Sequence, residues 1–258
     1  MSNNKATYLG RRRGWLTMLA IALSGCGGGG GGDPISGSAT VPASVVTPAV
    51  AQISSGTWVV MGSSTAAGAG APAGKGWVDL LQAATASRGA QFANIAVGGS
   101  VTYHGLSASA PAVSGRPSPN LAANIDQALL RKPVALIVSY PSNDTALGYS
   151  TEETVNNILS IRTKALAASV PVIVMSTQPR SLSDAQLEKL RMIDQHLAKS
   201  IGTCFVDVRT TLAGGDGRLA PQYDSGDGVH PNSAAHFVIA AEVEKMLNQE
   251  KCIGFVKN

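Results

Sequence analysis

The chain has 258 residues, of which 44% are hydrophobic and 14% are charged. This composition is typical of one well-packed globular domain, and the length disfavours a second full domain. The formal net charge is +4, but four cationic residues, and no acidic residue, precede residue 26: Lys5, Arg11, Arg12 and Arg13. The remaining chain is neutral, which argues against nucleic acid as a partner.

The first 25 residues are predicted to be an export signal. An apolar run at 15–23 follows the cationic residues and is too short to cross a bilayer as a membrane helix. The run ends in Leu23-Ser24-Gly25-Cys26, which resembles the bacterial lipoprotein signal, where the cysteine is lipidated and becomes the first mature residue. The resemblance implies export to the bacterial periplasm or cell surface, with a membrane anchor at Cys26 alone. A signal peptide cleaved near small residues, without lipidation, is the alternative.

Residues 26–54 are predicted to be a flexible linker. Six glycines follow Cys26, and the stretch after them is poor in charge and interrupted by prolines. The globular domain is expected over residues 55–258, as a monomer.

From residue 57 on, short β-rich apolar runs alternate with longer amphipathic segments. Strands are predicted at 57–61, 92–97, 134–140, 172–176 and 204–208. Helices are predicted at 76–87, 119–131, 151–169, 184–200 and 233–249. The alternation favours parallel strands joined by crossover helices, and so an α/β fold: a three-layer α/β/α sandwich with a five-stranded parallel sheet.

Two of these helices have explicit start signals. Ser150 with Glu153, and Ser183 with Gln186, each fit a capping box, in which the two side chains satisfy free backbone amides of the first turn. Both signals support the predicted helix positions.

In a parallel α/β sheet the ligand site lies at the carboxyl ends of the strands. The segments that follow the predicted strands are 62–65, 98–100, 142–144, 178–180 and 209–230. They contain a serine, a histidine, an aspartate and amide donors, which are the groups that a serine hydrolase needs.

Ser64 is predicted to be the nucleophile and His230 its general base. Asp227 lies three residues before His230, so it can hold the imidazole ring locally. The backbone amides of Ser64 and Gly99 and the side-chain amide of Asn143 are predicted to bind the developing oxyanion. Residues of the same chemistry lie nearby as alternatives: Ser63 for the nucleophile, and Asp216 and Asp224 for the acid.

Two further residues are predicted to contact substrate. Arg180 follows the fourth strand and is expected to meet an anionic or polar substrate group, unless it pairs with a local acid. His104 has no acidic neighbour in sequence, so we expect it only to line the pocket. The pocket walls are expected from the loops 100–118 and 209–226. The other two histidines outside the site fall in predicted helices and are assigned structural roles: His196 and His236.

Two cysteines lie outside the signal region, Cys204 and Cys252. An exported chain permits them to form a disulfide, and two free buried thiols are the alternative.

Four sequence blocks, each after a predicted strand, carry a family resemblance: "VVMGSSTAAG", "NIAVGGS", "SYPSND" and "DGVHPN". In this order they resemble the motifs of the SGNH hydrolases, the GDSL-type esterases and lipases. The resemblance implies a flavodoxin-like sheet and hydrolysis of small-molecule carboxylic esters through an acyl-enzyme, with no metal and no organic cofactor. It implies the same roles for Ser64, Asp227 and His230, and oxyanion donors at Gly99 and Asn143.

The blocks depart from the family pattern at two places. Ser63 stands where the first block usually has Asp, and Pro141-Ser142 stands where the third usually has Gly-x. Neither departure removes a predicted catalytic group. O-acyl transfer by the same triad, and a catalytically silent binding lipoprotein, are the alternative functions.

Overall fold

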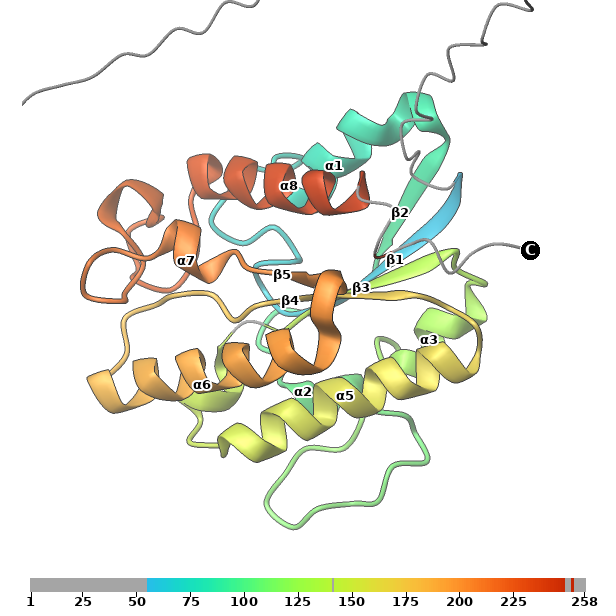
Figure 1. Ribbon diagram of the computed structural model, residues 1–258, viewed down its shortest axis with the longest axis horizontal. Coiled ribbons are helices and arrows are strands. Elements are labelled where there is room, and N and C mark those ends of the chain that lie inside the picture. Colours follow the sequence, from blue (N-terminus) through green and yellow to red (C-terminus); the bar gives the residue numbers. More distant parts are fainter. Residues whose placement is uncertain (1–54, 141, 249–251, 253–258) are drawn as a thin grey trace, which may run out of the picture. The chain divides into compact units, whose positions relative to one another are not determined.

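The computed structural model describes residues 55–140, 142–248 and 252 (Figure 1). The predicted signal peptide and linker, and with them Cys26, lie outside these residues. The described chain forms a five-stranded parallel sheet in the order β2-β1-β3-β4-β5. This is the doubly wound, flavodoxin-like order, so the predicted fold class is confirmed.

The strands are short and their central members are fully buried, as expected for a parallel sheet covered on both faces. Their bounds are β1 (Gly56–Gly62), β2 (Ala90–Asn94), β3 (Ala135–Ser139), β4 (Val172–Met175) and β5 (Phe205–Val206). The chain runs from β1 to β2 on one side and then returns to β3 on the other. The strand order therefore switches beside β1, where ligands bind in such sheets.

Helices cover both faces of the sheet (Figure 1). One layer contains α1 (Trp77–Thr85) and α8 (Ser233–Leu247), and the other contains α2 (Thr102–Gly105), α3 (Ile125–Leu130), α5 (Thr151–Ala167) and α6 (Asp184–Ile201). The shorter elements are α4 (Asn143–Ala146), α7 (Arg209–Leu212), η1 (Ala86–Arg88), η2 (Gly202–Cys204) and η3 (Pro221–Tyr223). In the described part of the chain, no helix has both the length and the apolar character to cross a membrane.

The two halves of the core follow from the alternation of side chains along β1. Val59 and Met61 pack into the core under α5 and α6, whereas Trp58 and Val60 pack into the core under α1 and α8. The two helix layers therefore pack against opposite faces of β1.

Some predicted bounds were wrong, for local reasons. The strand predicted at 204–208 is only two residues long, because the backbone amides of Val208 and Arg209 donate to Ser176 Oγ rather than extending the sheet. The helix predicted at 119–131 begins at Ile125, where Asn124 Oδ1 accepts the amide of Gln127 and caps the first turn. By contrast, both predicted capping boxes are present, at the starts of α5 and α6.

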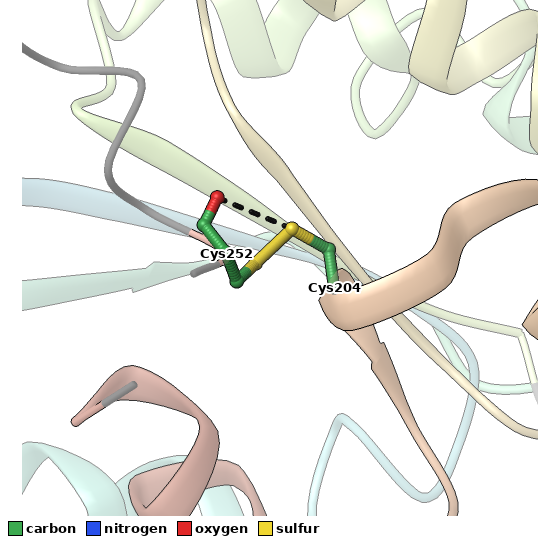
Figure 2. Close-up of a disulfide and its surroundings, with 2 residues drawn as sticks. All are labelled: Cys204 and Cys252. Carbon is green, nitrogen blue, oxygen red and sulfur yellow. Dashed lines mark hydrogen bonds between the residues drawn. A yellow bond between two sulfur atoms is a disulfide. The ribbon is translucent and has the colours of Figure 1, made fainter. Parts of the chain in front are cut away.

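Cys204 and Cys252 form a disulfide (Figure 2). It joins the residue before β5 to a buried position beyond α8. Cys204 Sγ also lies 3.2 Å from the carbonyl oxygen of Cys252. A disulfide sulfur carries no hydrogen, so this is a contact and not a hydrogen bond. The bridge closes a loop that contains both Asp227 and His230.

Candidate active site

The polar residues that follow the strands meet at one end of the sheet. Ser64 lies in the turn after β1, and Asn143 begins α4 after β3. Arg180 follows β4, while Asp227 and His230 lie in the loop between α7 and α8. The parallel strands thus bring together groups that are up to 166 positions apart in sequence.

Ser64, His230 and Asp227 form a continuous hydrogen-bonded series. His230 Nε2 lies 3.0 Å from Ser64 Oγ, and His230 Nδ1 lies 2.6 Å from Asp227 Oδ2. Asp227 Oδ1 also accepts the backbone amides of His230 and Val229, each at 2.8 Å. The hydrogen bonds from the His230 backbone and ring hold the pKa of Asp227 well below its usual range. An ionised carboxylate keeps a proton on Nδ1, which leaves Nε2 free to accept the serine proton.

The alternative residues have other partners. Ser63 is fully buried, and its Oγ accepts a hydrogen bond from Asn143 Nδ2 at 2.8 Å. Asp224 accepts the backbone amides of Gly226 and Gly228, so it shapes the turn. Asp216 pairs with Arg218. The structure therefore brings Ser64 and Asp227, and not these residues, to His230.

The predicted oxyanion donors differ in how free they are. The amides of Ser64 and Gly99 donate to no other group among the described residues. Gly99 has a φ of 77°, a left-handed conformation that glycine adopts readily. Asn143 Nδ2, however, donates both of its hydrogens, to Ser63 Oγ and at 2.9 Å to Ser100 O. A bound oxyanion would have to share one of these bonds.

Arg180 lies beside Asn143. Its Nη1 donates to Asn143 Oδ1 at 3.2 Å, which turns the Nδ2 end of the amide toward Ser63 and Ser100. Within the described residues Arg180 has no ion pair, and its buried Nε has no hydrogen-bond partner. Burial lowers the pKa of Arg180, and the nearby carboxylate of Asp227 opposes this shift. The guanidinium is thus a partly buried cation at the edge of the site.

The remaining histidines have separate surroundings. His104 Nδ1 accepts the backbone amide of Val101 at 3.0 Å, and burial lowers the pKa of the ring. His104 does not line the cavity beside Ser64. His196 is exposed on α6, whereas His236 is fully buried on α8. The structure therefore does not bring any of the three to the serine.

A cavity of about 310 Å³ adjoins Ser64. Its walls are almost entirely small residues of the segment between β1 and α1, and Asp79 and Gly98 also line it. The expectation that the loops 100–118 and 209–226 wall the pocket is wrong for this cavity. The loop 100–118 instead borders a separate cavity of about 270 Å³ over α5. The loop 209–226 folds back on itself through an antiparallel bridge between Ala213 and Leu219.

The run of glycine and alanine after Ser64 was not predicted to form this wall. It is the signal that could have indicated it, because small side chains next to a serine leave space for a substrate. The sequence also did not single out Gln178, although the selected segment 178–180 contains it. Its side chain accepts a hydrogen bond from Thr65 Oγ1 and donates one to Val229 O, so it joins the neighbours of Ser64 and His230. Nowhere in the described residues do three or more His, Cys, Asp or Glu side chains gather as a candidate metal site.

The serine, imidazole and carboxylate in series, with free amides beside the serine, define a serine hydrolase type of site. The model of the GDSL-like lipase/acylhydrolase family matches residues 60–237. The chain therefore belongs to this family of ester hydrolases, as the four sequence blocks predicted.

Solved structures share the fold at low identity. An esterase, EstA, from Pseudoalteromonas sp. has 18% identity and a TM-score of 0.56, over 75% of this chain and 99% of that one. A putative acylhydrolase from Bacteroides fragilis has 23% identity and a TM-score of 0.55, over 74% and 86%. A putative lipolytic protein of the G-D-S-L family from Desulfitobacterium hafniense has 14% identity and a TM-score of 0.59, over 74% and 98%. No curated protein sequence matches this chain.

Proposed function

We propose that the chain is a serine esterase that hydrolyses carboxylic esters through an acyl-enzyme on Ser64. The observation that carries the proposal is the series from Ser64 Oγ to His230 Nε2, at 3.0 Å, and from His230 Nδ1 to Asp227 Oδ2, at 2.6 Å. The first distance lies in the range in which a general base removes a proton, and the second is a short hydrogen bond that holds the ring in place. Ser64 is the nucleophile, His230 the general base and Asp227 the group that orients and stabilises the ring.

The reaction has two halves. His230 Nε2 takes the Ser64 proton while Oγ attacks the ester carbonyl carbon, and the imidazolium then protonates the departing alcohol oxygen. A water molecule next gives a proton to His230 and attacks the acyl carbon, so that the acid is released and Ser64 regains its proton. The amides of Ser64 and Gly99 stabilise the oxyanion in both halves, and Asn143 Nδ2 joins them by sharing one of its present bonds.

The substrate is proposed to be a small or medium acyl ester. The cavity beside Ser64, of about 310 Å³, is at the lower end of the size of small-molecule sites, and small side chains form its wall. Arg180, with no ion pair among the described residues, remains our proposed contact for a polar or anionic substrate group. His104, outside this cavity, is proposed only for a larger substrate that extends beyond it.

The test is hydrolysis of p-nitrophenyl esters of increasing acyl length by the purified chain, beside Ser64→Ala and Ser63→Ala. We expect Ser64→Ala to lose on the order of 10⁴-fold or more in kcat, because it removes the nucleophile. Ser63→Ala keeps Ser64 and His230 and should retain most of the activity. Full loss in Ser63→Ala alone would move the nucleophile to Ser63. Added sugars or alcohols would reveal acyl transfer, and an inert wild type would favour a binding protein.

We also propose that the chain is exported and anchored through lipid on Cys26. The short apolar run before this cysteine and the glycine-rich stretch after it support the proposal. The Cys204–Cys252 disulfide also fits an oxidising compartment. Metabolic labelling with a fatty-acid analogue should mark the wild type and not Cys26→Ala. Equal labelling of the two would exclude Cys26 as the site.

A further inference from the structure

The segment that follows β4 contacts each part of the proposed active site. Arg180 donates to Asn143, as described above. The backbone amide of Ser181 donates to the carbonyl of Gly228, at 2.6 Å, in the loop that carries His230. Gln178 binds two loops at once: the loop that carries Ser64 and the loop that carries His230.

The Gln178 side chain is buried, with 4% of the residue exposed, and both ends of its amide are bonded. Its Oε1 accepts a hydrogen bond from Thr65 Oγ1, and its Nε2 donates to Val229 O at 2.6 Å. Thr65 directly follows Ser64, and Val229 directly precedes His230. One side chain therefore connects the neighbour of the serine to the neighbour of the imidazole.

The helix layer in turn fixes the position of Gln178. The backbone amide and the hydroxyl of Thr177 donate to the two oxygens of Asp194 on α6, at 2.8 and 3.0 Å. Asp194 also pairs with Arg209 at the start of α7. Because its chain neighbour is tied to α6, Gln178 provides a fixed reference for both loops.

We propose that Gln178 is a positioning residue that sets the separation of Ser64 Oγ and His230 Nε2. The inference rests on the proposed function, since that separation matters only if the pair performs proton transfer. Transfer requires a distance of about 2.6–3.2 Å, and a misplacement of about 1 Å can reduce the rate roughly 100-fold. Gln178 does not touch the reacting atoms or line the cavity beside Ser64, so its effect should fall on kcat and not on KM.

The first test is Gln178→Met in the full chain, which retains the side-chain length and removes both hydrogen bonds. With a p-nitrophenyl ester we expect kcat to fall about 10- to 100-fold while KM stays within about 2-fold. The rate of labelling by a serine-directed phosphonate should fall similarly, because it also depends on the Ser64–His230 pair. Unchanged kcat, or a rise in KM alone, would overturn the proposal.

Gln82→Met is the matched control. Gln82 Nε2 donates to Ala90 O at 3.0 Å, and its Oε1 accepts the amide of Phe92 at 2.7 Å, so it also bridges two segments. It joins α1 to β2 and contacts neither catalytic loop. We expect Gln82→Met to lower Tm without changing kcat. Equal losses of kcat in Gln82→Met and Gln178→Met would overturn the proposal, because they would show that Gln178 affects activity only through the stability of the fold.

Gln178→Glu gives a second test of the positioning role, which can be used even if Gln178→Met does not fold. A protonated carboxyl at this position can accept from Thr65 and donate to Val229 O, whereas an ionised one can only accept. The ratio of its kcat to that of the wild type should therefore rise as pH falls. A ratio that is constant with pH would contradict the proposal. A wild type that neither hydrolyses esters nor reacts with the phosphonate would instead overturn the proposed function itself.

Discussion

Asp227 and Asp224 lie in the same loop but bind different groups. Asp227 Oδ2 contacts His230 Nδ1, whereas Asp224 accepts backbone amides of the turn. Asp227→Asn keeps the shape of the side chain but favours the wrong ring tautomer, with the proton on Nε2 facing Ser64. We expect kcat for a p-nitrophenyl ester to fall on the order of 10⁴-fold.

Asp224→Asn is the control for this prediction. The amide oxygen of asparagine can still accept the hydrogen bonds of Gly226 and Gly228, so kcat should stay within about 3-fold of the wild type. A loss in Asp224→Asn as large as that in Asp227→Asn would leave the acid unassigned. Melting curves of both variants separate loss of fold from loss of chemistry.

At the scale of single residues, the sequence predicts a contact when the two residues are close in sequence or when both follow strands of the predicted sheet. The spacing of three between Asp227 and His230 is enough to predict their contact, because it is made within one loop. The engagement of Asn143 by Ser63 and Ser100 was not predictable, since it joins three different loops. The same holds for Gln178, whose two partners lie 113 and 51 positions away.

Among the elements, α8 is connected through His236 to the segment between β1 and α1, which contains Ser64. Its Nδ1 accepts the amide of Trp77 at 3.1 Å, and its Nε2 lies 2.9 Å from Ala69 O. Only the neutral ring can accept at Nδ1 and donate at Nε2. Burial lowers the pKa of His236, the Ala69 carbonyl and Asp79 oppose the shift, and His230 adds to it.

The sign of the pH effect follows from this shift. Because the pKa of His236 in the folded state lies below its unfolded value of about 6.5, its contribution to stability is complete above that pH. The contribution is lost as pH falls below about 6.5, by at most about 1.4 kcal/mol per pH unit. The free energy of unfolding of the wild type should therefore decline more steeply with acidification than that of His236→Gln.

The difference in the free energy of unfolding between the wild type and His236→Gln isolates the pH dependence due to His236. Burial raises the pKa of Asp194 to about 6 and also raises that of Asp144, so these acids act in the opposite direction as pH falls. Both acids are present in the wild type and in the variant, and their effect cancels in the difference. Urea unfolding between pH 7.5 and 5 measures it, and parallel slopes for the two proteins would contradict the role of His236.

Element length decides how well the sequence predicts an element. The long helices α5, α6 and α8 lie within two residues of their predicted bounds at each end, because apolar periodicity and caps repeat the signal over several turns. The helices α2, α4 and α7 have four residues each and were not predicted, since one turn shows no period. Two of these, α2 and α4, begin at or just after the loops that carry the proposed oxyanion donors Gly99 and Asn143.

At the scale of the whole molecule, the sheet order follows from alternation of strand and helix together with the family motifs. The pairing of Cys204 with Cys252 did not follow, because sequence alone left two free thiols as an equal alternative. The disulfide closes a segment of 48 positions that includes β5, the loop that carries Asp227 and His230, and α8. The closed segment therefore includes Asp227 and His230.

Reduction of this disulfide should destabilise the protein. The chain-entropy model gives about 4 kcal/mol for a loop of this length, which corresponds to a fall in Tm of roughly 8–16 °C for a domain of this size. Below the new Tm the Ser64–His230 contact remains, so esterase activity should persist and then disappear at a lower temperature than in the oxidised protein. Melting curves and residual activity, each with and without a thiol reductant, measure both effects. The double variant Cys204→Ala, Cys252→Ala is the control: it should melt at the Tm of the reduced wild type, and its Tm should not change with reductant. If the Tm of the wild type did not change on full reduction, the disulfide would add no stability.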